Sequence, residues 1–185
     1  MDIAACELLI QNNEAHSLYI QTSYNYWIQY SLFTWKWWVL LFMFTVPWYF
    51  WWRMVDKKRF LEIWAYGLMT FIAVIGSDAT GVAWELWRYP IRLASKFPHI
   101  LPIDTTVFPI TYMLVYQYFS SWKSFIIAST VMAAVLAFVF EPIGVWVDVY
   151  ELISWKYYYS FPLYIIFALA LKAIIGIVKS VQVRP

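Results

Sequence analysis

The stretch from Phe125 to Val147 reads FIIASTVMAAVLAFVFEPIGVWV, and it decides the fold class of this chain. It carries no charge before Glu141, and its length matches the about 20 apolar residues that a helix needs to cross a bilayer. A soluble domain is about 45–50% apolar. Here 63% of the 185 residues are hydrophobic and 13% are charged. No soluble core could bury that much apolar surface, so the sequence predicts a membrane protein.

Further apolar segments flank this stretch and complete the predicted fold. They run from about Leu32 to Trp52, from Phe60 to Ser77 with a continuation through Trp87, from Leu101 to Phe119, and from Phe161 to Val178. Pro47, Pro109 and Pro142 are expected to kink or interrupt the segments that contain them. Because the connections are short, neighbouring helices should pack antiparallel. The sequence therefore predicts an all-α polytopic transmembrane bundle of about five spanning helices over residues 31–185. A polar to interfacial segment, residues 1–30, precedes it.

Basic residues predict the orientation of this bundle, since Lys and Arg favour the cytoplasmic side of a membrane. One side of the predicted bundle holds Arg53, Lys57, Lys58, Arg59, Lys123, Lys179 and Arg184. The other side holds Lys36, Arg88, Arg92, Lys96 and Lys156. The first set is larger, so we expect the N-terminus outside and the C-terminus in the cytoplasm. Three basic residues between positions 88 and 96 lie on the unfavoured side of this arrangement.

Two segments share one pattern of acids and glycines. They are Asp78-x-x-Gly81-Val82-x-x-Glu85 and Glu141-x-x-Gly144-Val145-x-x-Asp148. Seven residues are about two helical turns, so the two acids of each pair are expected to face the same way. Acidic side chains beside lipid are costly and mark functional sites.

The helix rise predicts how deep these acids lie. Asp78 and Glu141 fall just below the outer interface, and Asp104 falls in the same layer. Glu85 and Asp148 fall at or beyond the outer surface. If the three helices are neighbours, all five carboxylates converge on one outward-facing vestibule.

Several roles are open to these acids. They could be helix ends in water with no function, ligands of a hard cation, or part of a polar path across the membrane. Alternatively, apolar surroundings keep one acid protonated as a general acid. Nearby Trp84, Trp146 and Tyr150 favour this last role, since aromatic faces stabilise cations, although any membrane protein carries interfacial aromatics. Lys172 either extends toward the cytoplasm or pairs with Glu62 or Glu141.

The C-terminal third resembles a known group of proteins. The residues that carry this resemblance are Glu141-Pro142, Trp146, Tyr150 and the run Trp155-Lys-Tyr-Tyr-Tyr-Ser-Phe-Pro-Leu-Tyr164. They resemble a family of small, uncharacterised multi-pass membrane proteins from Bacillus-like bacteria. This resemblance implies a bacterial plasma membrane and no known activity.

A shorter resemblance concerns the segment Ala83-Trp84-Glu85 with Tyr89-Pro90. It is similar to the part of fungal integral-membrane terpene cyclases that carries an essential acid. Those enzymes pair this acid with a second carboxylate late in the chain, and Asp148 is the matching residue here. The resemblance implies that the acids protonate an epoxide or alkene, whose cation then cyclises against aromatic walls.

The functional hypothesis combines these observations. We expect an acidic, aromatic-lined pocket for a lipid-like or isoprenoid ligand, with cyclase-like acid catalysis. Glu85 and Asp148 are the candidate catalytic acids, and Asp78, Glu141, Asp104, Trp84, Trp146 and Tyr150 are the candidate binding residues. The alternatives are a substrate-binding or sensor subunit of a membrane complex, possible also as an oligomer, and a cation-binding protein.

Composition limits the other partners. A net charge of +2 gives no nucleic-acid footprint, and the single Cys6 excludes an intrachain disulfide and a cysteine-cluster metal site. No cofactor or metal motif is found, and membrane lipids are the expected surroundings.

Overall fold

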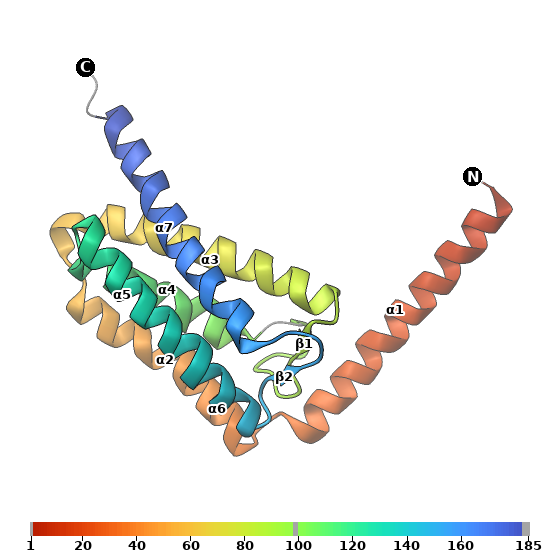
Figure 1. Ribbon diagram of the computed structural model, residues 1–185. Helices are drawn as coiled ribbons and strands as arrows, with labels where there is room; N and C mark the ends of the chain where they lie inside the picture. Colours follow the sequence, from red (N-terminus) through yellow and green to blue (C-terminus); the bar gives the residue numbers. More distant parts are fainter. Residues whose placement is uncertain (1, 98–99, 183–185) are drawn as a thin grey trace.

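A computed structural model describes residues 2–97 and 100–182 of the chain (Figure 1). The helices are α1 (Ile3–Tyr30), α2 (Trp35–Met54), α3 (Phe60–Ala83), α4 (Phe108–Tyr118), α5 (Trp122–Val135), α6 (Glu141–Trp146) and α7 (Tyr157–Gln182). A 3-10 turn, η1 (Lys57–Arg59), precedes α3, and two π-helical turns, η2 (Ile103–Val107) and η3 (Leu136–Phe140), precede α4 and α6. Strands β1 (Trp87–Arg88) and β2 (Glu151–Leu152) form one short antiparallel pair. The prediction of an all-α fold is confirmed.

Three helical segments are long and apolar enough to cross a membrane. They are Lys57–Ala83, Trp122–Trp146 and Tyr157–Val181, and each covers a predicted span. This finding is consistent with the predicted membrane protein. Among the described residues, α2 and α4 fall short of the same criterion, so the predicted number of about five spans is not confirmed. α4 has only 11 residues, against the about 20 that a spanning helix needs.

Helices α3, α4, α5 and α7 enclose the main core. Tyr66 of α3 stacks on Tyr116 of α4 with ring centroids 4.3 Å apart. The Tyr66 hydroxyl donates to the carbonyl oxygen of Ala168 in α7, 3.1 Å away, so its polar atom is satisfied inside the core. Gly67 of α3 lies against Met113 of α4, where a Cβ would come within 2.4 Å of the sulfur. Such a small residue lets two helices approach closely, as is common between membrane helices.

The repeated acid–glycine pattern is the sequence of two similar helix ends. After α3, the amide of Leu86 donates to the Gly81 carbonyl at 2.9 Å and the amide of Glu85 donates to the Val82 carbonyl at 3.1 Å. These two bonds define a Schellman motif, in which the residue after the helix takes a left-handed conformation. Glu85 has φ of 52°, as the motif requires.

The end of α6 repeats these bonds. The amide of Val149 donates to the Gly144 carbonyl at 3.0 Å, the amide of Asp148 donates to the Val145 carbonyl at 3.1 Å, and Asp148 has φ of 53°. Because each helix stops before its second acid, the prediction that both acids of a pair face the same way is wrong. Asp78 is buried, whereas Glu85 is exposed.

Prolines produce the two π-helical turns. Pro109 and Pro142 lack the amide that would continue a regular helical ladder. The backbone amide of the residue just before each proline donates to the carbonyl oxygen five residues earlier. The Phe108 amide donates to Ile103, and the Glu141 amide donates to Leu136. A π turn widens the helix locally and is frequent at functional sites. The predicted interruptions at Pro109 and Pro142 thus take this form, and each lies beside an acid, Asp104 or Glu141.

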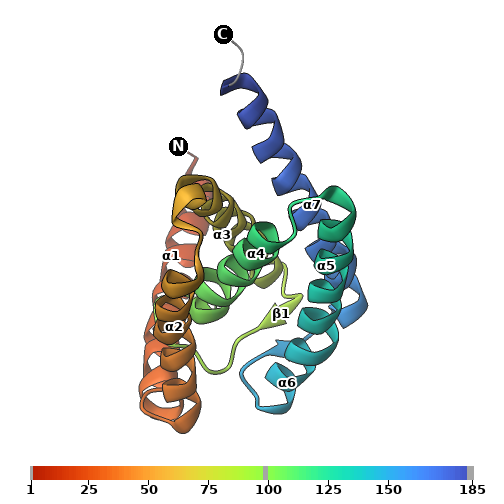
Figure 2. The same ribbon diagram turned by 90° about the vertical axis from the view of Figure 1, so that its left-hand side faces the viewer.

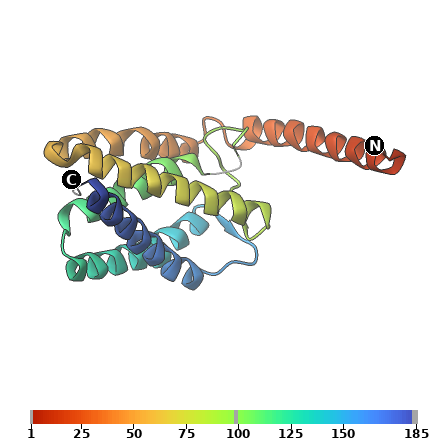
Figure 3. The same cartoon turned by 90° about the horizontal axis from the view of Figure 1, so that it is seen from above.

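Helix α1 projects away from the bundle, as Figures 1 and 3 show. None of its residues is buried, although apolar side chains such as Ile3 and Leu8 occur along it. Its C-terminal end is attached by polar contacts: the Trp27 indole donates to the Arg92 carbonyl at 2.9 Å, and the Arg92 guanidinium donates to Ser23 at 2.6 Å. Arg92, which lay on the unfavoured side of the charge pattern, therefore anchors α1.

Substituting the glycine under the α3 turn tests the Schellman end. A Cβ on Gly81 would come within 2.0 Å of the Trp87 ring, which is buried. We expect Gly81→Ala to lower the free energy of unfolding by about 1–3 kcal/mol through overpacking. The midpoint of thermal unfolding in micelles measures this loss. Gly76→Ala in the same helix is the matched control, since its Cβ would meet nothing within 4 Å. Equal midpoints for both variants would show that Trp87 does not pack on Gly81.

Candidate functional site

A cavity of about 290 Å³ lies in the half of the bundle that holds the strand pair. Its walls come from α2, α3, the η2–α4 segment, the η3–α6 segment and α7. Figure 2 shows α2 and α6 on either side, with α4 and β1 between them. Aromatic lining residues include Trp35, Trp87, Tyr89, Phe108, Tyr150 and Trp155. Three acids also line it: Asp78, Asp104 and Glu141.

Asp78 and Asp104 form a pair of buried carboxyl groups at one wall. Their exposed fractions are 5% and 3%. Burial, followed by the nearby Asp78, raises the pKa of Asp104 well above its ordinary value, which favours its protonated form. Asp104 Oδ2 is buried and accepts no hydrogen bond from the described residues. Asp104 is therefore a buried acid with one oxygen that has no partner.

Two donors from the chain after α3 hold Asp78 in place. The Trp87 indole donates to Asp78 Oδ1 at 2.8 Å, and the Tyr89 hydroxyl donates to the same oxygen at 2.5 Å. Burial, followed by the nearby Asp78, raises the pKa of Tyr89 well above its ordinary value, so its hydroxyl stays protonated and donates. The Schellman turn at Gly81 is what brings both donors back over the last turns of α3.

Glu141 lies at a different wall of the cavity. Its Oε1 accepts from the Tyr164 hydroxyl of α7 at 2.6 Å, and its Oε2 is buried without a partner. Tyr150 also lines the cavity and stacks on Tyr89, with centroids 5.5 Å apart. Burial raises the pKa of Tyr150, so this phenol is neutral as well. The cavity thus combines neutral aromatic walls with two unpartnered carboxyl oxygens, a combination that suits a ligand with hydrogen-bond donors or a developing positive charge.

Two ion pairs join chain segments that also contribute residues to the cavity. Lys36 of α2 lines the cavity and reaches Asp148, after α6, at 3.3 Å. Arg88 of β1 makes a bidentate pair with Glu151 of β2, with both N–O distances at 2.7 Å. This pair accounts for a second basic residue on the unfavoured side, since Arg88 stabilises the strand pair.

The cavity includes some of the predicted site residues and leaves out others. Asp78, Asp104, Glu141 and Tyr150 line it. Glu85 and Asp148, the candidate catalytic acids, lie at the exposed helix ends and are not in its lining. Trp84 and Trp146 are 73% and 82% exposed and also lie outside. The expected convergence of five carboxylates is therefore a convergence of three.

Sequence reasoning missed Trp87, Tyr89 and Tyr164 as partners of the acids. The sequence spacing contains a signal for the first of these. Trp87 follows Gly81 by six residues and Tyr150 follows Gly144 by six, so the same turn places an aromatic residue over each glycine. Tyr164, by contrast, reaches Glu141 from a separate helix, and no local pattern predicts that contact.

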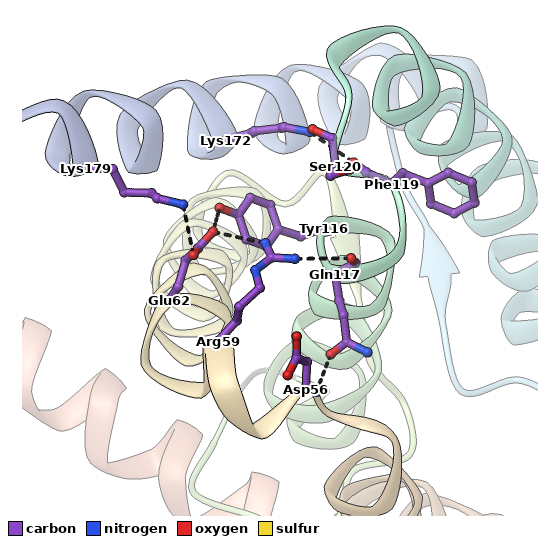
Figure 4. Close-up of polar contacts among 9 residues, drawn as sticks. All are labelled: Asp56, Arg59, Glu62, Tyr116, Gln117, Phe119, Ser120, Lys172 and Lys179. Carbon is purple, nitrogen blue, oxygen red and sulfur yellow. Dashed lines mark hydrogen bonds and ion pairs between the residues drawn. The ribbon is translucent and has the colours of Figure 1, made fainter.

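A second cluster of charged residues lies at the opposite end of the bundle (Figure 4). Glu62 accepts from Arg59 at 3.0 Å, from Tyr116 at 2.5 Å and from Lys179 at 3.0 Å. These contacts tie the start of α3 to α4 and α7. Both Glu62 oxygens have partners, so this cluster has the character of a structural clamp.

Lys172 completes the same end of the bundle. Its ammonium donates to the carbonyl oxygens of Phe119 and Ser120 at 3.0 and 2.9 Å (Figure 4). It also lies 3.9 Å from the centroid of the Phe125 ring. Cations near a helix C-terminus satisfy its last carbonyls, here those that follow α4. The predicted alternative of a pair with Glu62 or Glu141 is wrong, because Glu62 pairs with Lys179 and Glu141 bonds Tyr164.

Neither a metal-binding arrangement nor a similarity to known proteins assigns a function to this site. Within residues 2–97 and 100–182, no group of three or more His, Cys, Asp or Glu side chains is arranged to hold a metal ion. No family model, curated protein or solved structure matches the chain. The residues of the cavity are therefore the features that bear on its function.

The Arg88–Glu151 pair gives the β1–β2 strand pair a pH dependence. The hydrogen bonds that Glu151 accepts from Arg88 lower the pKa of Glu151 in the folded protein. The stabilisation is therefore present above the ordinary Glu pKa of about 4.3 and is lost as the pH falls through the lowered value. Glu151→Gln should lower the thermal midpoint slightly at neutral pH, and the difference from wild type should vanish in acid. A difference that persists unchanged in acid would contradict this assignment. The effect is small because both groups are exposed.

Proposed function

We propose that this membrane protein binds a lipid-like ligand of the isoprenoid class in the acidic cavity and transfers a proton to it. The observation that carries the proposal is Asp104: it is 3% exposed, lies beside Asp78, and has one oxygen without a partner at the wall of an aromatic cavity. Asp104 is then the acid that gives its proton to the ligand, and Asp78 is the neighbouring carboxyl group that favours the protonated form of Asp104.

The cavity walls support an apolar ligand. Small-molecule pockets are concave and mostly apolar with a few placed polar groups, and this cavity of about 290 Å³ fits that description at the small end of their range. Protonation of an alkene or epoxide leaves a carbocation, which the faces of Trp87, Tyr89 and Tyr150 can stabilise. Exclusion of water by the apolar walls protects such a cation from premature capture.

This proposal moves the acid role away from Glu85 and Asp148. Both are exposed at helix ends and neither lines the cavity, so neither meets a ligand bound inside it. The proposal thus keeps the type of chemistry that the resemblance to terpene cyclases implies, but it assigns that chemistry to different residues. Trp84 and Trp146 keep an interfacial role, in contact with lipid headgroups.

A specific observation favours a second candidate function. Helix α1 has no buried residue, yet it carries exposed apolar side chains along its length. Exposed apolar surface of this kind is typical of lipid or protein contact. The second candidate is therefore a ligand-binding or sensor subunit that uses α1 to join a larger membrane complex.

The membrane and orientation follow from the basic residues and the C-terminal resemblance. We place the chain in a bacterial plasma membrane, surrounded by lipid, with the clamp around Glu62 on the cytoplasmic side. The cluster from Arg53 to Arg59 lies at that end, as basic residues on the inner side do. The cavity then lies in the outer half of the membrane.

Variants of two acids test the proposed chemistry. Cells that express the protein beside an enriched prenyl pool are extracted with organic solvent, and the extracts are compared by mass spectrometry. We expect a cyclised or rearranged lipid from the wild type and its loss in Asp104→Asn, by about 100-fold or more, because the amide cannot donate an acidic proton. Glu7→Gln on α1 is the matched control.

The opposing outcomes of this experiment are equally definite. Loss of product in Glu85→Gln with retention in Asp104→Asn would return the acid role to the helix end. Identical extracts from all variants and from cells without the protein would refute catalysis and favour the subunit hypothesis.

The single cysteine tests the orientation. Cys6 lies on α1, so a membrane-impermeant maleimide should label it in intact cells if the N-terminus is outside. Labelling is read by mass shift, with denatured protein giving the total reactive thiol. Labelling that requires permeabilised cells would place the N-terminus in the cytoplasm and reverse the proposed topology.

A further inference from the structure

We propose that the polar head preferred by the cavity is a protonated amine, so that lipophilic amines are its tightest ligands. This inference rests on the proposed function, since it assigns the ligand to the same cavity. It adds the charge of the ligand, which the proposed chemistry does not specify.

The hydrogen-bond groups of the cavity lining favour a ligand that donates. Asp104 Oδ2 and Glu141 Oε2 are buried without partners, and both belong to residues that line the cavity. Tyr89 and Tyr164 already donate their hydroxyl protons to Asp78 and Glu141. The cavity therefore presents open acceptors, and a buried acceptor left open costs free energy that a ligand N–H would recover.

The charged residues that line the cavity favour a positively charged ligand. Three acids line the cavity, and the only basic residue among the described lining residues is Lys36, which is paired with Asp148. Among the described lining residues, a ligand headed by carboxylate or phosphate would meet three carboxyl groups and no basic side chain outside an ion pair. A protonated amine would meet acceptors on two walls, and hydrogen bonds from an ionised donor are about twice as strong as those between neutral groups.

The aromatic walls of the cavity also favour a cation with an apolar tail. Trp87, Tyr89 and Tyr150 surround the acids, and their ring faces attract an ammonium as they would a carbocation. The same walls accept an apolar tail. A lipophilic amine is thus the stable ligand whose charge resembles the cationic intermediate of the proposed reaction.

A matched series of ligands tests this inference. The protein is placed in phosphatidylcholine nanodiscs, and dissociation constants are measured for farnesylamine, farnesol and farnesoic acid, which share one tail. We expect the amine to bind at least about tenfold more tightly than the alcohol, with the acid weakest. Asp104→Asn should remove the preference for the amine while farnesol binding changes by less than about threefold.

The control and the contrary results separate this inference from the proposed function. Glu14→Gln on α1 removes an acid outside the cavity and should keep the wild-type order of affinities. If Asp104→Asn does not fold, Glu141→Gln tests the second open oxygen in the same way. Equal binding of the three ligands, or tightest binding of the acid, would overturn the amine preference and leave the lipid pocket intact. Binding of none of them would overturn both proposals.

Discussion

Burying Asp78 against Asp104 is the constraint on which the outer half of this molecule depends. A carboxyl group in an apolar interior costs several kcal/mol unless it is hydrogen-bonded, so each must find partners. Asp78 receives them from Trp87 and Tyr89, which follow α3 in the chain. They reach back only because α3 ends in a tight turn, and that turn needs Gly81, where a side chain would strike the Trp87 ring. The strand pair then joins this turn to the end of α6.

The two ends of the bundle treat their charged groups in opposite ways. Around Glu62, both carboxylate oxygens are occupied by Arg59, Tyr116 and Lys179, so that end of α3 is fixed to its neighbours. Around the cavity, Asp104 and Glu141 each keep one open oxygen. Buried polar groups are normally satisfied, so a carboxyl oxygen without a partner at a cavity wall needs an explanation. This contrast supports the proposal that the end with the cavity is a site and that the end around Glu62 is a clamp.

Much of the fold could be predicted from apolar length, because a bilayer permits only helices whose backbone bonds are internal. The spans at α3, α5–α6 and α7 follow from that rule. Periodicity failed at Glu85 and Asp148, since it assumes a continuing helix and both residues lie just past one. Of the cavity acids, Asp78, Asp104 and Glu141 could be identified because acids in apolar segments are rare. Their partners Tyr89 and Tyr164 could not, because those contacts depend on chain reversal and on packing of α7. The number of about five spans is not confirmed, since α4 has only 11 residues after the π turn before Pro109.

The strand pair has one consequence for the origin of the site. Arg88 opposes Glu151, and these residues are separated by 63 positions, the same interval that separates Asp78 from Glu141 and Gly81 from Gly144. An antiparallel pair has a local two-fold axis between its strands, so equivalent residues of the two halves meet on that axis. If an ancestral helix pair dimerised through this contact between strands, it would have placed two identical acids around one symmetric chamber. Fusion of the copies would free each acid to acquire its own neighbours. Asp78 now accepts from Trp87 and Tyr89 of its own segment, whereas Glu141 accepts from Tyr164 of α7, and this difference is what such a history leaves behind.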